Sequence, residues 1–143
     1  MICAFFGHRD ANERIGVRVK RLVLELIEKE KTVKFYVGNN GKFDYIVQCV
    51  LREMKKEGVA LEYRIVLSRI GETALSKEQD VTIFPEGLER SLPKFAISNR
   101  NEWLIKQADV VIACVKFEAS NSFKWVERAR KRGAKIIYCD EVK

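Results

Sequence analysis

Short apolar runs alternate along this chain with longer amphipathic segments, and this alternation constrains the fold more than any other feature. Apolar runs occupy residues 2–7, 33–38, 61–67, 109–115 and 134–140. Apolar side chains at helical spacing predict helices over 12–30, 43–57, 98–107 and 120–132. Strands that take turns with helices form parallel sheets, and helices cover both faces of such sheets. We therefore expect an α/β fold, a three-layer Rossmann-like sandwich.

The order of the strands decides where a ligand would bind. For a mostly parallel five-stranded sheet we predict the order 3-2-1-4-5, in which the first and fourth strands are neighbours. Ligands of open α/β sheets bind where the chain reverses its direction of progress, beyond the carboxyl ends of the strands. Residues 68–94 contain both prolines and no sustained period. We expect this segment to be a loop that closes over the site, with Pro85-Glu86-Gly87 as a rigid corner.

Length and composition indicate one soluble domain over residues 1–143. Hydrophobic residues make up 47% of the chain and charged residues 33%, which excludes a disordered protein. No apolar run approaches the roughly 20 residues that span a bilayer, so we expect no membrane partner. Met1 leads directly into ICAFFG without a basic leader, so we expect a cytoplasmic protein.

The net charge of +7 is concentrated in one stretch of the chain. Residues 116–135 hold seven basic and two acidic side chains, and most of the basic ones fall in the last turns of a predicted helix. Cations there complement the helix dipole, so a solvated helix face explains the cluster. Nucleic-acid binding remains an alternative, although no base-reading motif supports it.

The four cysteines are Cys3, Cys49, Cys114 and Cys139, and their spacing is wide. Three of them fall inside apolar strand-like runs, so we expect buried, reduced thiols. A metal site would require closer spacing and more than the single histidine of this chain. We therefore expect neither a metal nor a cofactor.

Polar and glycine residues follow three of the predicted strands, where ligand contacts would gather. The candidate ligand-binding residues at these ends are Gly7, His8 and Arg9 after the first strand, Gly38, Asn39, Asn40, Gly41 and Asp44 after the second, and Ser120, Asn121 and Ser122 after the fourth. Glycines let a backbone approach a ligand, and free N–H groups at a helix start attract anions. Each motif also has a structural interpretation: a histidine that only donates or accepts hydrogen bonds, a plain turn, or a helix N-cap.

Arg100 and Asn101 complete the candidate set. Arg100 is predicted to lie in the first turn of its helix, where a cation is unfavourable to the dipole. A carboxylate or phosphate ligand would explain an arginine at that position, because its planar guanidinium binds two oxygens at once. A surface salt bridge to Glu86 or Glu89 is the alternative explanation.

Several of these stretches occur together in one known group of proteins. GHR at residues 7–9, YVGNNGKFD at 36–44, TIFPEGLE at 82–89, PKFAISNRNEWLI at 93–105 and ADVVIACV at 108–115 resemble the SLOG superfamily. That group includes the lonely-guy phosphoribohydrolases and the DNA-processing protein A domain, and the chain is most similar to its small stand-alone YpsA-like members. The resemblance covers nearly the whole chain. It implies a single SLOG-like domain that binds a nucleotide-like small molecule where the sheet changes direction.

The lonely-guy enzymes also suggest catalytic residues. They place an arginine before the fourth strand and a P-G-G-x-G-T-x-x-E motif after it, and Arg100 and Glu127 stand at the corresponding positions. The glutamate is retained, whereas serine, asparagine and lysine replace the glycines and the threonine of that motif. These departures favour binding or sensing of a nucleotide without turnover.

Two other functions and one assembly question remain open from the sequence. Cleavage of a nucleoside monophosphate by Arg100 and Glu127 is the first alternative. The purely structural explanation of Glu127 is an ion pair on the helix surface with Arg130 or Lys131. Nucleic-acid binding through the basic helix is the second. A homo-oligomer is also open, because exposed Trp103 or Trp125 could serve an interface.

Overall fold

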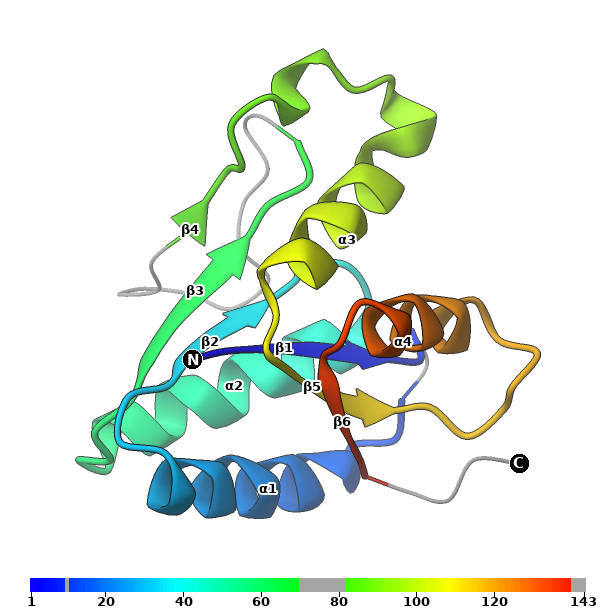
Figure 1. Ribbon diagram of the computed structural model, residues 1–143. Coiled ribbons are helices and arrows are strands. Elements are labelled where there is room, and N and C mark those ends of the chain that lie inside the picture. The colour runs from blue at the N-terminus through cyan, green and yellow to red at the C-terminus, as the bar shows by residue number, and fades with distance from the viewer. Residues whose placement is uncertain (10, 70–81, 140–143) are drawn as a thin grey trace.

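The computed structural model describes residues 1–9, 11–69 and 82–139, which form a parallel sheet covered by helices (Figure 1). The strands are β1 (Ile2–Gly7), β2 (Lys34–Val37), β3 (Glu62–Val66), β4 (Thr82–Ile83), β5 (Val110–Cys114) and β6 (Lys135–Tyr138). The helices are α1 (Ile15–Lys29), α2 (Lys42–Lys56), α3 (Ala96–Gln107) and α4 (Asn121–Lys131). Each predicted strand and helix is present, with ends that differ by a few residues from the sequence-based bounds.

The sheet has six strands in the order β4-β3-β2-β1-β5-β6, and every pairing is parallel. The five predicted strands lie in the predicted order, with β5 and β6 as the fourth and fifth. The additional strand, β4, extends the edge beyond β3. The chain reverses its direction of progress between β1 and β5, whose last residues Gly7 and Cys114 pair.

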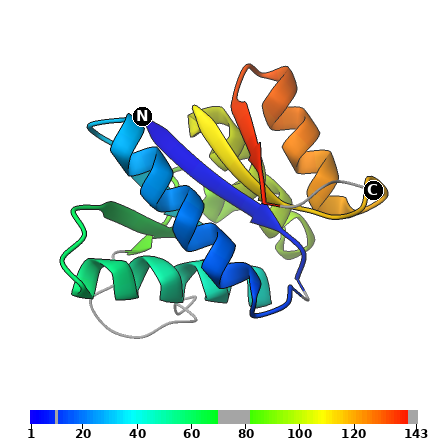
Figure 2. The ribbon, with the colours of Figure 1, turned by 90° about the horizontal axis from the view of Figure 1, so that it is seen from below.

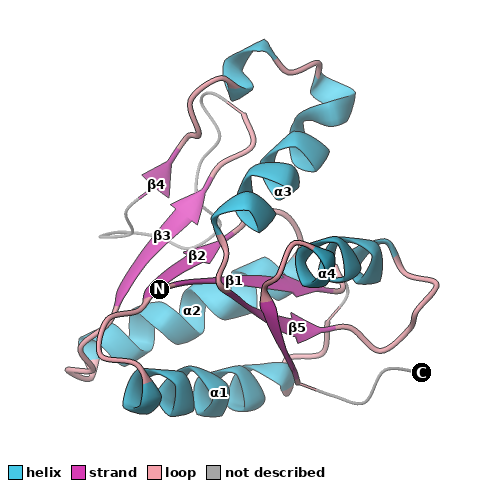
Figure 3. Ribbon diagram, in the orientation of Figure 1, coloured by secondary structure: helices cyan, strands magenta, loops and turns pink. Residues whose placement is uncertain are grey.

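Two pairs of helices enclose the sheet, which gives the predicted three layers. In Figures 2 and 3, α1 and α2 cover one face and α3 and α4 cover the other. Side chains of β1 alternate between the two cores: Cys3 and Phe5 pack with α1 and α2, whereas Ala4 and Phe6 pack with α3 and α4. This period of two explains why the strand is apolar throughout. Phe5 is 2% exposed, and its burial contributes about 2–3 kcal/mol.

Part of segment 68–94 departs from the predicted loop. β4 lies at its centre, and the backbone N–H of Leu67 donates to the Ile83 carbonyl. Two short 3₁₀ helices follow, η1 (Leu88–Arg90) and η2 (Pro93–Phe95), and lead directly into α3. Sequence periodicity missed β4 because two residues are too few to show alternation. Residues 70–81 lie outside the described residues.

The prediction that all four cysteines are reduced is wrong for two of them. Cys114 and Cys139 form a disulfide, with a Cα–Cα distance of 5.0 Å. Ala113 of β5 pairs with Tyr138 of β6, so the next residue of each strand lies at the separation that a disulfide requires. Cys3 and Cys49 are free thiols.

The helices of the described residues are all too short or too polar to cross a bilayer.

Candidate functional site

A pocket of about 220 Å³ lies at the carboxyl end of the sheet, where β1 and β5 part. Its described lining residues are Phe5, Phe6, Gly7, His8, Arg9, Gly38, Asn40, Asp44, Ile97, Arg100, Asn101, Leu104, Ser120, Asn121, Ser122 and Trp125. They come from the end of β1, from the loops after β1, β2 and β5, and from helices α2, α3 and α4. We call this hollow the candidate pocket, and it lies where the predicted strand order places a ligand.

All of the predicted ligand-binding residues line the candidate pocket except Asn39 and Gly41. Asn39 is 3% exposed, and its side-chain oxygen accepts a hydrogen bond of 3.0 Å from Gln48 Nε2. Gln48 also donates to the Gly38 carbonyl at 2.8 Å, so this buried amide holds the loop after β2 in place. Gly41 is the N-cap residue of α2 and lies against Arg9: a Cβ added at Gly41 would be 3.2 Å from the Arg9 Cα atom. These two positions therefore shape the loop, and ligand contact by the others stays a prediction.

Arg100 is buried at the back of the candidate pocket, with 4% of its surface exposed. Its Nη1 donates to Asn40 Oδ1 at 2.8 Å, and its Nε and Nη2 donate to Asn101 Oδ1 at 3.2 and 2.9 Å. The side-chain oxygens of Asn40 and Asn101 thus fix the orientation of the guanidinium. Burial of a cation costs free energy of folding, so a structural or functional reason must explain the buried position of Arg100.

The helix that carries Arg100 begins two residues earlier than predicted. α3 begins at Ala96 because η2, with Pro93 at its first position, leads into it, so Arg100 falls in the second turn. The suggested partner Glu89 is exposed, and its carboxylate accepts from the backbone N–H of Gly87 at 2.9 Å.

Gly38 allows two charged side chains to approach the loop after β2. A Cβ added at this residue would lie 2.6 Å from Arg100 Nη1 and 2.6 Å from Asp44 Oδ2. Asp44 is 8% exposed, and its Oδ2 also accepts from the backbone N–H of Asn40 at 2.9 Å. The carboxylate lies in the first turn of α2, where the helix dipole favours a negative charge.

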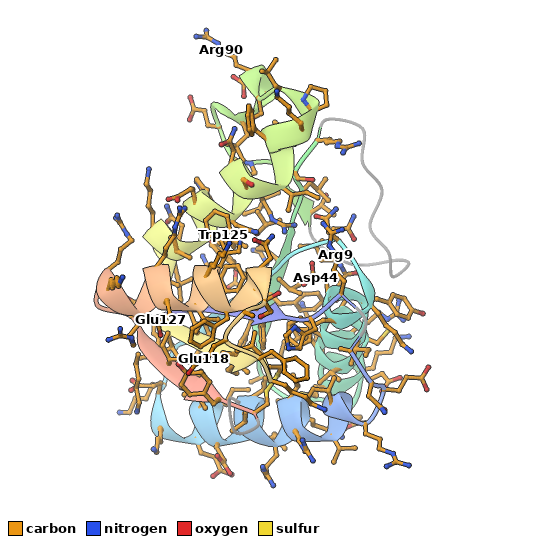
Figure 4. The ribbon with its side chains drawn as sticks, turned by 90° about the vertical axis from the view of Figure 1, so that its right-hand side faces the viewer. Arg9, Asp44, Arg90, Glu118, Trp125 and Glu127 are labelled. Carbon is orange, nitrogen blue, oxygen red and sulfur yellow. A yellow bond between two sulfur atoms is a disulfide. The ribbon has the colours of Figure 1, made fainter. Side chains whose placement is uncertain are left out.

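The loop after β1 is tied to the start of α2. The backbone N–H of Lys42 donates to the Arg9 carbonyl at 2.9 Å, and a Cβ at Gly7 would lie 2.5 Å from the Phe43 ring. Figure 4 shows Arg9 and Asp44 near one another at this end of the sheet. Arg9 is exposed and contributes a cation at the mouth, whereas Arg100 contributes a buried cation inside.

The N-terminus of α4 faces the same pocket. Ser120 is the N-cap, and its hydroxyl accepts from the Phe123 N–H at 3.2 Å. The Ser122 hydroxyl donates to the Gly7 carbonyl at 2.8 Å, which docks the start of α4 onto the end of β1. The N–H groups of the first helical turn have no carbonyl partner within the helix. They add to the positive potential that Arg9 and Arg100 create.

His8 joins the loops after β1 and β5. Its Nε2 accepts a hydrogen bond of 2.7 Å from the backbone N–H of Lys116, and its ring lies 5.8 Å from that of Phe117. The hydrogen bond requires an unprotonated Nε2, so the ring is neutral with its proton on Nδ1. The structure thus gives His8 a structural role while also placing it in the pocket wall.

An apolar wall completes the pocket, and the sequence analysis did not include it. Ile97 and Leu104 line the pocket together with Arg100 and Asn101 of the same helix. Positions 97, 100, 101 and 104 follow the spacing of one helix face. Trp125 lies on α4 one turn after the polar residues at its start. Helical periodicity extended from Arg100 and from Ser122 would have found all three apolar residues.

The predicted catalytic residue Glu127 does not line the candidate pocket. Its carboxylate accepts from Arg130 Nη2 at 2.8 Å, one turn along α4. Figure 4 shows Trp125 and Glu127 on opposite sides of this helix, as a separation of two residues requires. Hydrogen bonding by Arg130 lowers the pKa of Glu127. The helix-surface pair that the sequence offered as the alternative is the arrangement in the structure.

The basic face of α4 is partly engaged within the protein. Arg128 forms a salt bridge with Glu102 at 2.6 Å. The Cζ atom of Arg128 also lies over the Trp125 ring, 4.8 Å from the ring centroid. Neither tryptophan is fully exposed: Trp103 stacks on Tyr36 at 5.6 Å, and Trp125 lines the pocket. Both tryptophans are partly buried rather than exposed, and a homo-oligomer of this chain stays a prediction. In the described ranges, no three His, Cys, Asp or Glu side chains gather as a metal site would require.

No family model matches this chain, and no curated protein matches it.

Proposed function

We propose that the candidate pocket binds a nucleotide or a nucleotide derivative, and that the protein binds or senses this ligand without converting it. The buried Arg100, facing an apolar wall that contains Trp125, is the observation that carries the proposal. A ligand for such a site requires an anionic group and a flat apolar group, and a nucleotide has both. The resemblance of the GHR and GNNG motifs to the SLOG superfamily supports the same ligand class.

The charges suggest how such a ligand would lie. Among the described lining residues, Arg9 and Arg100 outweigh the single carboxylate of Asp44. A phosphate would accept hydrogen bonds from Arg9 and from the first-turn N–H groups of α4. A base would stack on Trp125, because aromatic stacking tolerates any base. Asp44 and Asn101 remain for the hydroxyl groups of a sugar.

The size of the pocket limits the ligand. Its volume of about 220 Å³ is below the roughly 300–1,000 Å³ of most small-molecule sites. We therefore expect one nucleotide unit, bound with part of its surface in contact with solvent.

The position of the carboxylates supports binding without turnover. Cleavage of an N-glycosidic bond requires a carboxylate close to the sugar that stabilises positive charge or positions water. Glu127 lies outside the pocket, and Asp44 already accepts a backbone hydrogen bond from Asn40. Cleavage remains the alternative. Incubation with nucleoside monophosphates, followed by chromatography for free base, separates the two functions.

A thermal-shift screen tests the binding proposal directly. Adenosine, guanosine, cytidine and uridine mono- and diphosphates are added to the purified protein, and at least one should raise the melting temperature, because a ligand held by the folded state stabilises it. Arg100→Lys keeps the charge but loses the bidentate geometry, and should weaken binding about tenfold or more. Arg21→Lys, on the exposed surface of α1, is the matched control. A panel without any shift, or equal affinity for the Arg100→Lys variant, would reject this function.

A further inference from the structure

A second hollow of about 410 Å³ lies on the other side of His8 from the candidate pocket, and we call it the cysteine hollow. Its described lining residues are His8, Ala11, Asn12, Arg14, Ile15, Arg18, Cys114, Lys116 and Phe117. They come from the loop after β1, the start of α1 and the end of β5. The volume is within the range of small-molecule sites.

The disulfide gives this hollow its reactive group. Cys114 lines the hollow, and it is bonded to Cys139, which follows β6 and is partly exposed. The remaining thiols lie elsewhere: Cys3 is fully buried in the core, and Cys49 is on α2. The Cys114 side of the disulfide is therefore the sulfur that a molecule in the cysteine hollow would meet.

The described lining residues of the cysteine hollow carry charge of one sign. Arg14, Arg18 and Lys116 are cations, and none of the described lining residues is a carboxylate. Arg14 and Lys116 make no ion pair with any described residue. α1 begins beside the hollow and has no acidic residue in its first turn, so its dipole adds to the positive potential. An anion in the hollow would be attracted by all of these groups.

The geometry points to the cysteine hollow as a docking site for a small anionic thiol that reduces the Cys114–Cys139 disulfide reversibly. The substrate class is a low-molecular-weight thiol that carries carboxylate groups. Cations close to a cysteine stabilise its thiolate, and they also draw an anionic thiolate towards the disulfide. Phe117 and Ile15 would contact the aliphatic part of such a molecule.

The exchange proceeds in two balanced steps. The thiolate of the substrate attacks Cys114 Sγ, a mixed disulfide forms, and Cys139 leaves as a thiolate that takes a proton from water. A second substrate thiolate attacks the substrate-derived sulfur of the mixed disulfide, which releases the oxidised substrate dimer and expels Cys114 as a thiolate that takes a proton from water. The protein disulfide gains two electrons, which two substrate thiols lose. The reverse sequence oxidises the protein.

Reduction rates with thiols of different charge provide the test. Glutathione is anionic, 2-mercaptoethanol is neutral and cysteamine is cationic. Each rate of reduction of the purified protein is divided by the fraction of thiolate present. We expect glutathione to react roughly tenfold faster than cysteamine at low salt, and the ratio to shrink in 0.5 M NaCl as charges are screened. Equal rates, a preference for cysteamine, or no reduction by any of the three would overturn the proposal.

Charge variants assign the preference to this hollow. Arg14 and Lys116 are exposed, so Arg14→Gln and Lys116→Gln should fold, as circular dichroism can verify. Each should lower the glutathione-to-cysteamine ratio by roughly threefold. Arg21→Gln removes the same charge from α1 outside the hollow and should leave the ratio unchanged. If Arg21→Gln lowers the glutathione-to-cysteamine ratio by the same factor, the preference arises from the net charge of the protein and not from the cysteine hollow.

The site of reaction can be trapped. Cys139→Ser leaves Cys114 as a free thiol, which should form a mixed disulfide with oxidised glutathione faster than Cys49 or Cys3 does. Peptide mass spectrometry identifies the modified cysteine at early times. Modification of Cys49 before Cys114 would show that the hollow does not direct the reaction.

Discussion

His8 Nε2 accepts a hydrogen bond of 2.7 Å from the backbone N–H of Lys116, and this contact separates the candidate pocket from the cysteine hollow. The two residues lie at the carboxyl ends of the neighbouring strands β1 and β5, more than one hundred residues apart in sequence. The neutral His8 ring is thus a shared wall of both hollows.

Replacing His8 by leucine should weaken both the fold and the pocket. The Lys116 N–H would lose its acceptor, which costs about 1 kcal/mol in the free energy of unfolding. Urea denaturation measures this change. His8→Gln, which offers a side-chain oxygen at a similar reach, should recover most of the stability. A leucine variant as stable as the native protein would show that the contact contributes little.

Gly38→Ala should disturb the candidate pocket by displacing two of its charged side chains. The added Cβ would lie 2.6 Å from both Arg100 Nη1 and Asp44 Oδ2, so at least one side chain must move. We expect a loss of about 1–3 kcal/mol in stability, together with weaker nucleotide binding. Gly16→Ala is the control, because its Cβ would meet Ile46 at 3.4 Å and alanine favours the helix. Urea denaturation of both variants measures their stabilities, and a loss in Gly38→Ala alone would assign the effect to the contacts with Arg100 and Asp44.

Glu127→Gln should leave ligand affinity unchanged, because its carboxylate pairs with Arg130 outside the pocket. The hydrogen bond from Arg130 lowers the pKa of Glu127, so this carboxylate stabilises the folded state above the ordinary glutamate pKa. That contribution is lost as the pH falls through the lowered pKa. The stability difference between the native protein and the variant should therefore be small at neutral pH and vanish once the pH has fallen below the lowered pKa of Glu127. Calorimetric binding and pH-dependent denaturation check the two expectations, and a loss of affinity would return Glu127 to the candidate catalytic residues.

Cys3 should be inert in the folded protein. It is fully buried, and burial raises the pKa of its thiol far above the usual value. Only the thiolate reacts with aromatic disulfide reagents. Titration of the oxidised native protein should therefore detect Cys49, whereas Cys3 should react only after denaturation. Rapid modification of Cys3 without denaturant would indicate that β1 opens readily.

Much of the fold could be predicted because strand order follows from few rules. Parallel strands joined by helices leave few arrangements, and the motifs after the first, second and fourth strands therefore had to meet at one edge of the sheet. Arg9, Asn40 and Arg100 line one pocket for this reason, although they are far apart in sequence. Trp125 was missed because its helix was interpreted by charge rather than by the face it presents.

The disulfide was predictable from the same rules but was not recognised. Cys114 and Cys139 end two strands that the predicted order makes neighbours, and their wide spacing in sequence concealed this proximity. The additional strand β4 was not predictable, because Thr82 and Ile83 carry no periodic signal. Nor was the start of α3, which depends on η2 and its Pro93 rather than on the polar residues that follow.

The redox state of Cys114 should change the affinity of the candidate pocket. The backbone N–H of Lys116, two residues after Cys114, donates to His8 Nε2, so we expect a change at the disulfide to reach the loop that carries this contact. We expect the oxidised and reduced proteins to differ severalfold in affinity for the nucleoside monophosphate that raises the melting temperature most. Because coupling is reciprocal, the same nucleotide should shift the midpoint of a glutathione redox titration by the same factor. Calorimetry on the oxidised and the reduced protein measures the ratio of affinities, and redox titration with and without nucleotide measures the shift of the midpoint. The double variant Cys114→Ser/Cys139→Ser is the control, since its affinity should not respond to reductant. Equal affinities of the oxidised and reduced proteins, together with an unchanged titration midpoint, would show that the two hollows are not energetically coupled.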